Sequence, residues 1–252
     1  AILVGAQAIY LHAGDAELAV AEYTTDADLA LDPALLDKIP PLEQALQRAG
    51  FAPMGSRGVG VWKTSRRGSD DRDVEVQVDV LVPNAVSPGT GRRAARLPGH
   101  DVHAARKVVG LEGVLVDQAQ MLIGSLEPDK DPRRIEARVA GPGALLAAKL
   151  FKMNERKGTS RSSDKDALDI FRILQEVETN VLTGSLRRIL DDDRSQATGE
   201  RALVLFTELF GTRGSDGAVM AARATRPLMD EAEVRLRSEL LVQDLIATLS
   251  KE

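Results

Sequence analysis

The spacing of apolar residues changes along this chain, and that change constrains its fold more than any other feature. From Asp73 to Val80, polar and apolar residues alternate, which is the two-residue period of a β-strand with one buried face. After Gly143, apolar residues recur every three or four positions, which is the period of an α-helix. We therefore predict a mixed α/β (α+β) sheet core in residues 1–110, followed by a mainly helical C-terminal domain in residues 111–252.

Shorter patterns predict the individual elements. The Pro-, Gly- and Arg-rich stretch at 88–100 is expected to be an exposed loop. Gly50 is expected to end the helix that precedes it. Strands are predicted near 26–31, 59–64 and 74–82, with two edge strands at 113–116 and 135–139, and helices at 7–12, 42–49, 144–156, 164–177, 182–190, 200–209 and 231–249.

The composition excludes several classes of function. Only 3% of residues are aromatic, so stacking on nucleic-acid bases cannot be a major binding device, and Trp62 is expected in the core. The chain has no cysteine, which excludes disulfides, thiolate metal sites and a cysteine nucleophile. No stretch reaches the roughly 20 apolar residues of a membrane span. No leader sequence is visible, so we expect a cytoplasmic protein without a membrane partner.

Two acidic residues stand two positions apart in the first predicted strand. Strand alternation places Asp26 and Asp28 on one face, while Ala27 and Leu29 point to the other. Two neighbouring carboxylates repel each other unless a cation lies between them, and carboxylate oxygens suit Mg²⁺ or Mn²⁺. An exposed turn is the structural alternative for such a pair. The functional interpretation is a divalent metal site.

A third carboxylate lies on the alternating strand. Val74, Val76, Val78 and Val80 are expected on its buried side, and Asp79 on its polar side. If this strand neighbours the first, Asp79 joins Asp26 and Asp28. Two metals about 4 Å apart could then bind a triphosphate and activate an attacking hydroxyl.

Upstream of these strands, an apolar run ends at Gly5, and Ala6 opens a helical pattern. A glycine there lets backbone N–H groups approach a phosphate at a helix N-terminus. An ordinary strand-to-helix turn would look the same. We interpret Gly5 and Ala6 as nucleotide-binding residues.

The Gly5-Ala6 turn, the strand with Thr25–Leu29 and the strand with Val78–Leu81 together resemble the nucleotidyltransferase fold. Within that fold they resemble the AbiEii-like toxins of bacterial toxin–antitoxin systems. Two later segments, Leu145–Leu150 and Lys165–Ile170, resemble the same family in having a Lys on one helix and a basic–Asp pair at the start of the next. The resemblance spans roughly residues 4–175.

The resemblance implies roles for helical residues. It implies that Lys149 contacts a nucleoside triphosphate (NTP) and that Asp166 is a catalytic or positioning carboxylate. Lys149, Lys152 and Arg156 are spaced as one basic stripe along a helix, which could bind a triphosphate or a polynucleotide backbone. For the stripe, the structural alternative is a solvated or partly buried helix face. For Asp166 it is a capping box with Ser163.

The predicted activity is transfer of a nucleotide monophosphate from an NTP to an acceptor hydroxyl, assisted by Mg²⁺ or Mn²⁺. The resemblance implies the 3′ end of tRNA as acceptor, growth inhibition as outcome and a cognate antitoxin as a possible partner. Two alternatives stay open. The chain could modify a small molecule, as aminoglycoside nucleotidyltransferases do. The net charge of −5 favours this alternative, whereas the Arg-rich loop at 92–96 and the basic stripe at 149–156 favour RNA. It could also be a non-catalytic binding module with the same fold.

Overall fold

The computed structural model describes residues 1–14, 26–55, 58–68, 72–87, 91, 93–125 and 128–251. Thr25 of the sequence motif lies outside these residues, as do Arg92 and residues 88–90 of the predicted loop. Contacts within the chain define two units. The first comprises Ala1–Gln7, Glu22–Val109 and Ala119–Val139, and the second comprises Ala8–Ala21, Gly110–Gln118 and Ala140–Glu252.

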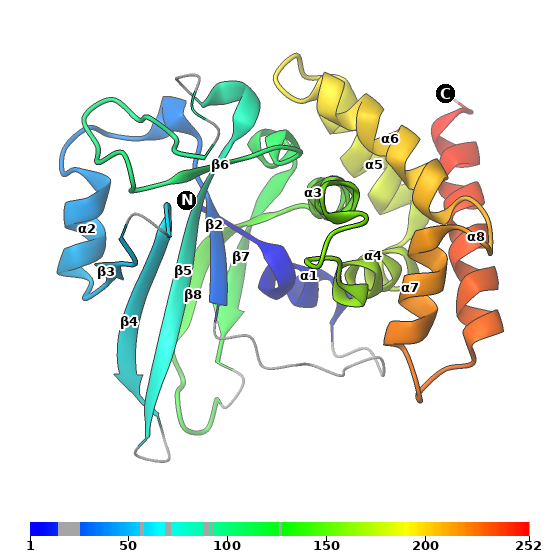
Figure 1. Ribbon diagram of the computed structural model, residues 1–252, viewed down its shortest axis with the longest axis horizontal. Coiled ribbons are helices and arrows are strands. Elements are labelled where there is room, and N and C mark those ends of the chain that lie inside the picture. Colours follow the sequence, from blue (N-terminus) through cyan, green and yellow to red (C-terminus); the bar gives the residue numbers. More distant parts are fainter. Residues whose placement is uncertain are drawn as a thin grey trace. The chain divides into compact units, whose positions relative to one another are not determined.

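The first unit is built on a mixed β-sheet. Within the described residues the sheet has eight strands, in the order β3-β4-β5-β2-β1-β8-β7, and β6 pairs with β5 (Figure 1). β2 runs antiparallel to β1 and parallel to β5. The strands are β1 (Ile2–Val4), β2 (Asp26–Ala30), β3 (Ala52–Pro53), β4 (Val61–Arg67), β5 (Asp73–Pro83), β6 (Arg106–Val108), β7 (Gln118–Gly124) and β8 (Arg134–Ala140).

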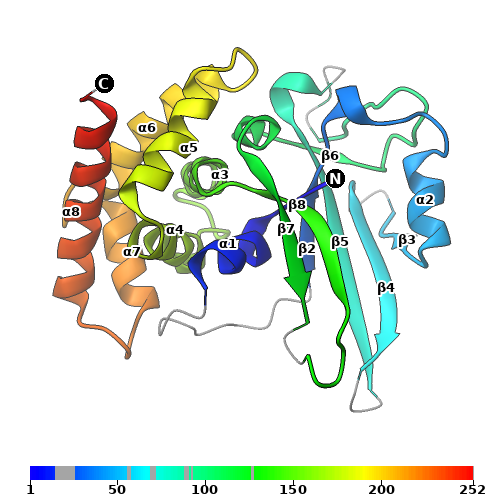
Figure 2. The ribbon, with the colours of Figure 1, turned by 180° about the vertical axis from the view of Figure 1, so that it is seen from behind.

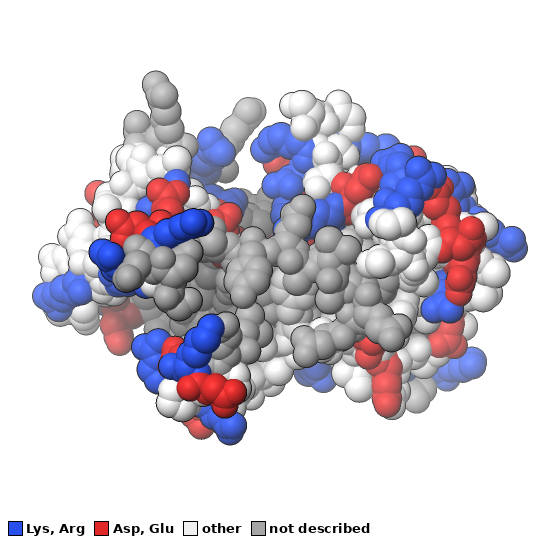
Figure 3. All heavy atoms as spheres, turned by 90° about the horizontal axis from the view of Figure 1, so that it is seen from below, with Lys and Arg blue, Asp and Glu red and all other residues white. Residues whose placement is uncertain are grey.

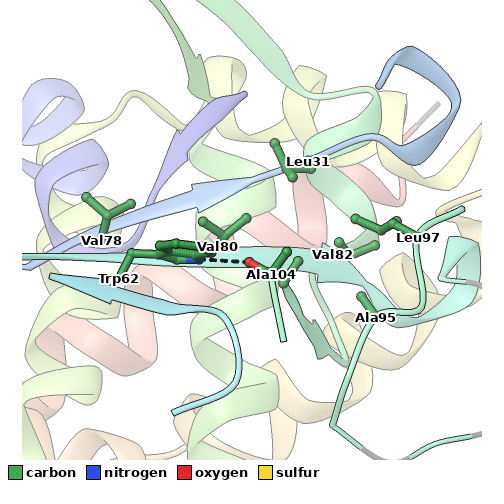
Figure 4. Packing of buried hydrophobic residues seen from close by; sticks show 9 residues of the cluster. Leu31, Trp62, Val78, Val80, Val82, Ala95, Leu97 and Ala104 are labelled. Atoms are coloured by element: carbon green, nitrogen blue, oxygen red, sulfur yellow. Dashed lines mark hydrogen bonds between the residues drawn. The ribbon is translucent and has the colours of Figure 1, made fainter. Parts of the chain in front are cut away.

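Trp62 is the largest side chain in the core of this unit and is only 2% exposed, which confirms its predicted core position. Its indole Nε1 donates a hydrogen bond to the backbone oxygen of Ala104 at 3.0 Å (Figure 4). Ala95 and Leu97 pack into the same cluster. The prediction that 88–100 is an exposed loop is therefore wrong at these two positions. Ala95 and Leu97 are buried, although they form no periodic pattern in the sequence.

The helix α2 (Leu42–Arg48) covers one side of this cluster, with Leu42 and Leu46 partly buried against it. Gly50 follows the helix with φ +86°, so the predicted glycine terminator is confirmed. Short 3-10 turns occur at η1 (Pro33–Leu35), η2 (Asn84–Val86) and η3 (Glu112–Leu115).

Three predictions about strands are wrong. Residues 113–116 belong to the buried turn η3, because a short apolar run alone does not distinguish a strand from a buried turn. The strand at 135–139 exists as β8 but lies between β1 and β7, so it is not at an edge. Val74 is 38% exposed, because β5 becomes buried only toward its second half.

The second unit is helical, and α3 (Pro142–Arg156) packs against α4, α5 and α6 (Figure 2). The period after Gly143 correctly predicted five of its helices. It missed α7, whose small residues give little apolar contrast. None of the described helices combines the length and apolarity of a membrane span. The other helices are α1 (Gly5–Ala13), which begins in the first unit, α4 (Asp164–Glu176), α5 (Thr179–Leu190), α6 (Gln196–Phe210), α7 (Asp216–Ala224) and α8 (Glu231–Leu249).

Asp117 caps the start of α3 from a distance in sequence. The residue is fully buried, and one of its oxygens accepts a hydrogen bond from the backbone N–H of Ala144 at 2.9 Å. The other accepts from Ser185 Oγ at 2.6 Å and from Arg188 Nη2 at 2.7 Å. A carboxylate at a helix N-terminus is stabilised by the free N–H groups and the helix dipole. Asp117 thus fixes α3 against α5.

We expect Asp117→Ala to lower the free energy of unfolding by about 3 kcal/mol, because it leaves the buried donors at Ala144 and Ser185 without their acceptor. Urea unfolding followed by circular dichroism measures the change. Asp131→Ala, at a carboxylate on the surface, is the control and should stay close to wild type. Equal stability of both variants would contradict the capping role.

Candidate active site

The two strands that carry the predicted carboxylates are direct neighbours. In the parallel pairing of β2 with β5, Asp28 is the register partner of Asp79, and Asp26 is the partner of Gln77. Register partners on parallel strands project from the same face of the sheet. The structure therefore brings Asp28 and Asp79 side by side. Asp26 lies on the same face, two residues before Asp28 and opposite Gln77.

The opposite face of these strands is apolar. Ala27 and Leu29 of β2 pack toward the cluster that contains Val78 and Val80 of β5. Because side chains alternate along a strand, burial of these residues forces the intervening aspartates to the other face. The alternation of residues in the sequence correctly predicted that the apolar side chains of these two strands face the core and that Asp28 and Asp79 face the other side.

Gly5 lies directly against Asp28. Its φ is +75°, a conformation that favours glycine. A Cβ at this position would overlap Oδ2 of Asp28 and lie 3.1 Å from its Cγ. Val4, which precedes the glycine, is the register partner of Asp28 on β1. The start of α1 and the carboxylate of Asp28 therefore share one small space, with Ala6 half-buried beside them.

We expect Gly5→Ala to displace the carboxylate of Asp28 and to reduce any activity of the site at least tenfold, with a stability loss of about 1–3 kcal/mol. Gly14→Ala is a matched control. Gly14 also has a positive φ (+63°), but a Cβ there would meet nothing within 4 Å. The control should lose some stability and keep its activity. Equal activity losses in both variants would show that backbone strain, and not contact with Asp28, is the cause.

Asp79 has two side-chain partners that the sequence did not reveal. Its Oδ2 accepts from Arg106 Nη2 at 2.7 Å, and its Oδ1 accepts from Gln77 Nε2 at 3.0 Å. Gln77 is two residues away on the same strand and could have been found by alternation. Arg106 comes from β6, whose pairing with β5 has no local sequence signal. These bonds hold the carboxylate in one orientation.

The donor chemistry fits a magnesium ion bound together with substrate. Within the described ranges, no group of three or more His, Cys, Asp and Glu side chains is arranged to hold a metal. Mg²⁺ typically takes only one or two carboxylates and completes its shell with waters and substrate phosphates. Asp28 and Asp79 supply such a pair. The participation of Asp26 as a third ligand stays a prediction.

The helical residues form a separate cluster inside the second unit. Lys149 is 8% exposed, and its Nζ donates to Asp166 Oδ1 at 3.0 Å and to Asp169 Oδ2 at 2.6 Å. Lys152 and Arg156 also contact Asp166, at 3.0 and 3.2 Å. Burial by itself favours the neutral form of Lys149, but Asp169 and Asp166 raise its pKa above the ordinary 10.5. Lys149 is therefore a buried, charged member of an ion network.

The carboxylate of Asp166 belongs to this network. The capping-box interpretation of Asp166 is wrong, because its carboxylate faces the cations of α3, while Ser163 Oγ accepts from the backbone of Lys165. Asp169, which the sequence analysis missed, lies three residues after Asp166 on the same helical face. Lys152 is 39% exposed and Arg156 is 30% exposed, so these two cations are the accessible part of the basic stripe.

Comparison with known proteins gives little further information. No protein-family model matches the chain, and no curated protein matches it. Among solved structures, the chain is similar to an antigenic nucleotidyltransferase-like protein from Paracoccidioides brasiliensis, with a TM-score of 0.40 and 14% sequence identity. The match covers 80% of this chain and 84% of that chain.

The distribution of charge gives no uniform basic surface on the face that Figure 3 shows. Lys and Arg side chains alternate there with Asp and Glu side chains among the described residues. Where opposite charges lie this close together, their fields partly cancel.

Proposed function

We propose that this protein is a nucleotidyltransferase, which transfers a nucleotide monophosphate from an NTP to an acceptor hydroxyl. The observation that carries the proposal is the placement of Asp28 opposite Asp79, with Gly5 and the start of α1 against Asp28. Carboxylates for a divalent cation and a helix N-terminus that suits a phosphate then occur together, as phosphoryl transfer requires.

In the proposed reaction, Asp28 and Asp79 would hold Mg²⁺, and Asp26 is proposed as a third ligand. The cation would neutralise charge on the phosphates. The acceptor oxygen attacks the α-phosphorus in line, the bond to the leaving pyrophosphate breaks, and the hydroxyl proton passes to a carboxylate or to water. Asp79 orients the hydroxyl, and the backbone at Gly5 and Ala6 contacts the phosphates. Positioning and charge neutralisation supply most of the rate acceleration.

The proposal extends to the helical residues as the family resemblance implies them. Lys149 and Lys152 would contact the triphosphate, and Asp166 would position them. The ion network supports Lys152 as the member that reaches a ligand, because it is more exposed than Lys149. Burial lowers the pKa of Lys152, and neighbouring Lys149 lowers it further. An anionic ligand near Lys152 would relieve that repulsion.

The acceptor is proposed to be the 3′ end of tRNA, with growth inhibition as the result and a cognate antitoxin as partner. The resemblance to AbiEii-like toxins supports this choice. The net charge of −5 favours the second candidate, a small-molecule acceptor such as an aminoglycoside.

Incubation with each labelled NTP, Mg²⁺ and total tRNA, with and without aminoglycosides, distinguishes the candidates. Labelled tRNA supports the first acceptor, and a labelled small molecule supports the second. Absence of labelled product under every condition would overturn the proposed activity and favour a non-catalytic binding module.

A further inference from the structure

The contact between Arg106 and Asp79 has a consequence for metal binding. We propose that Arg106 competes with the divalent cation for Asp79, so that the metal enters together with the nucleotide triphosphate and binds weakly without it. This inference rests on the proposed function, and it assigns a positioning and regulating role to a residue outside the predicted carboxylate site.

The ion pair is close and partly shielded from solvent. Arg106 Nη2 lies 2.7 Å from Asp79 Oδ2, and the two side chains are 33% and 14% exposed. A charge-assisted hydrogen bond of this length is among the stronger side-chain interactions, and partial burial reduces its screening by solvent. A cation that approaches Asp79 therefore meets a carboxylate that is already bound.

The backbone places Arg106 at this position. β6 pairs with β5 so that Arg106 is the register partner of Leu81, two residues after Asp79 on the same face. A second bridge joins Arg106 to Ala94. The backbone of Arg106 is thus paired on two sides, with β5 and with Ala94, which limits where its side chain can reach.

Gly60 allows the backbone of Arg106 to approach β4 and β5. Its φ is +75°, and a Cβ there would lie 2.7 Å from the N of Arg106 and 2.6 Å from the O of Val80. The bond from Trp62 to Ala104 fastens the chain two residues before Arg106 onto the core (Figure 4). These contacts therefore hold the backbone of Arg106 where its side chain reaches Asp79.

The charges around Asp79 explain why the metal would bind more tightly together with the nucleotide. Arg106 offsets one of the two negative charges of the Asp28–Asp79 pair, and it repels a divalent cation at short range. A triphosphate brings phosphate oxygens as additional ligands and additional negative charge. The complex of metal and nucleotide is then favoured over the bare ion at the same carboxylates.

Direct binding of Mn²⁺ to the full chain without nucleotide tests the inference, with free Mn²⁺ measured by electron paramagnetic resonance. We expect Arg106→Gln to bind Mn²⁺ about tenfold more tightly than wild type, because the competing charge is removed. Arg106→Lys keeps the charge and should stay within about threefold of wild type. Lys107→Gln makes the same charge change one residue further along β6 and should also resemble wild type.

Unchanged or weaker Mn²⁺ binding by Arg106→Gln, in a variant that unfolds in urea like wild type, overturns the inference. Tightening by Lys107→Gln to the same extent also overturns it, because net charge alone would then be the cause. The proposed function has its own test in Asp28→Asn. If that variant binds Mn²⁺ with NTP as tightly as wild type, Asp28 is not a ligand, and the proposed function fails with the inference.

Discussion

Replacement of Asp28 with Asn is expected to reduce nucleotidyl transfer on the order of a thousandfold. An amide oxygen carries no net charge, so the site loses half of the negative charge that the Asp28–Asp79 pair presents to a divalent cation. The substitution preserves the size of the side chain beside Gly5. Transfer of labelled nucleotide, measured at saturating Mg²⁺, gives the ratio of rates.

Stability is the accompanying measurement for this variant. Urea unfolding of Asp28→Asn shows whether a loss of transfer is accompanied by a loss of folding. Asp73→Asn, at the exposed start of β5, is the matched control and should retain full activity. An Asp28→Asn variant that transfers nucleotide at the wild-type rate would remove the basis for the proposed site.

The sequence predicted the face on which Asp28 and Asp79 lie, because the alternation that shows it is contained within each strand. A two-residue period needs only five or six neighbours to show which face of a strand is buried, and Ala27, Leu29 and Val78 supplied that signal. The parallel pairing of β2 with β5 was not local. In the sequence it was only a condition for Asp79 to join Asp26 and Asp28, and the register shows that the two strands are neighbours.

The contact of Arg106 with Asp79 could not be predicted from the sequence. The residue begins the three-residue strand β6, which follows a stretch rich in glycine, proline and arginine. Its position depends on burial of Ala95 and Leu97 and on the close approach at Gly60. Such tertiary contacts have no period and therefore leave no pattern in the sequence.

For the basic residues of α3, the sequence predicted the helix face but not the burial. Spacing correctly aligned Lys149, Lys152 and Arg156 on one side of a helix, but it could not show how deep each lies. Lys149 is buried, whereas Lys152 and Arg156 are partly exposed. Asp169 was missed because an Asp inside an apolar helical run gives no sign of its partner.

Lys149→Met is the substitution with the largest expected effect on stability. It removes the cation shared by two buried carboxylates, and loss of one partner from a buried ion pair costs about 3–5 kcal/mol. Lys152→Met, one turn further along α3 at a more exposed position, should cost less than about 1 kcal/mol. Urea unfolding followed by circular dichroism compares the two variants.

The dependence of stability on pH identifies the network as the cause. Burial would raise the pKa of Asp166, but Lys149 and Lys152 together lower it below the ordinary 3.8. Its contribution is therefore present above the unfolded pKa and is lost as the pH falls through the folded value. The raised pKa of Lys149 has the opposite sign: its contribution is present below 10.5 and is lost as the pH rises through the folded value.

Lys149→Met should accordingly lose the alkaline part of this dependence and move the acid part toward higher pH, since Asp166 is then held by fewer cations. Wild type and Lys152→Met should keep the alkaline part. Lys149→Met could instead be as stable as wild type at every pH and no longer use NTP. That result would mean that Lys149 contacts the nucleotide and that the ion network does not stabilise the fold. A large stability loss with the expected change in pH dependence assigns Lys149 to the architecture of the helical unit and leaves Lys152 as the cation for a triphosphate.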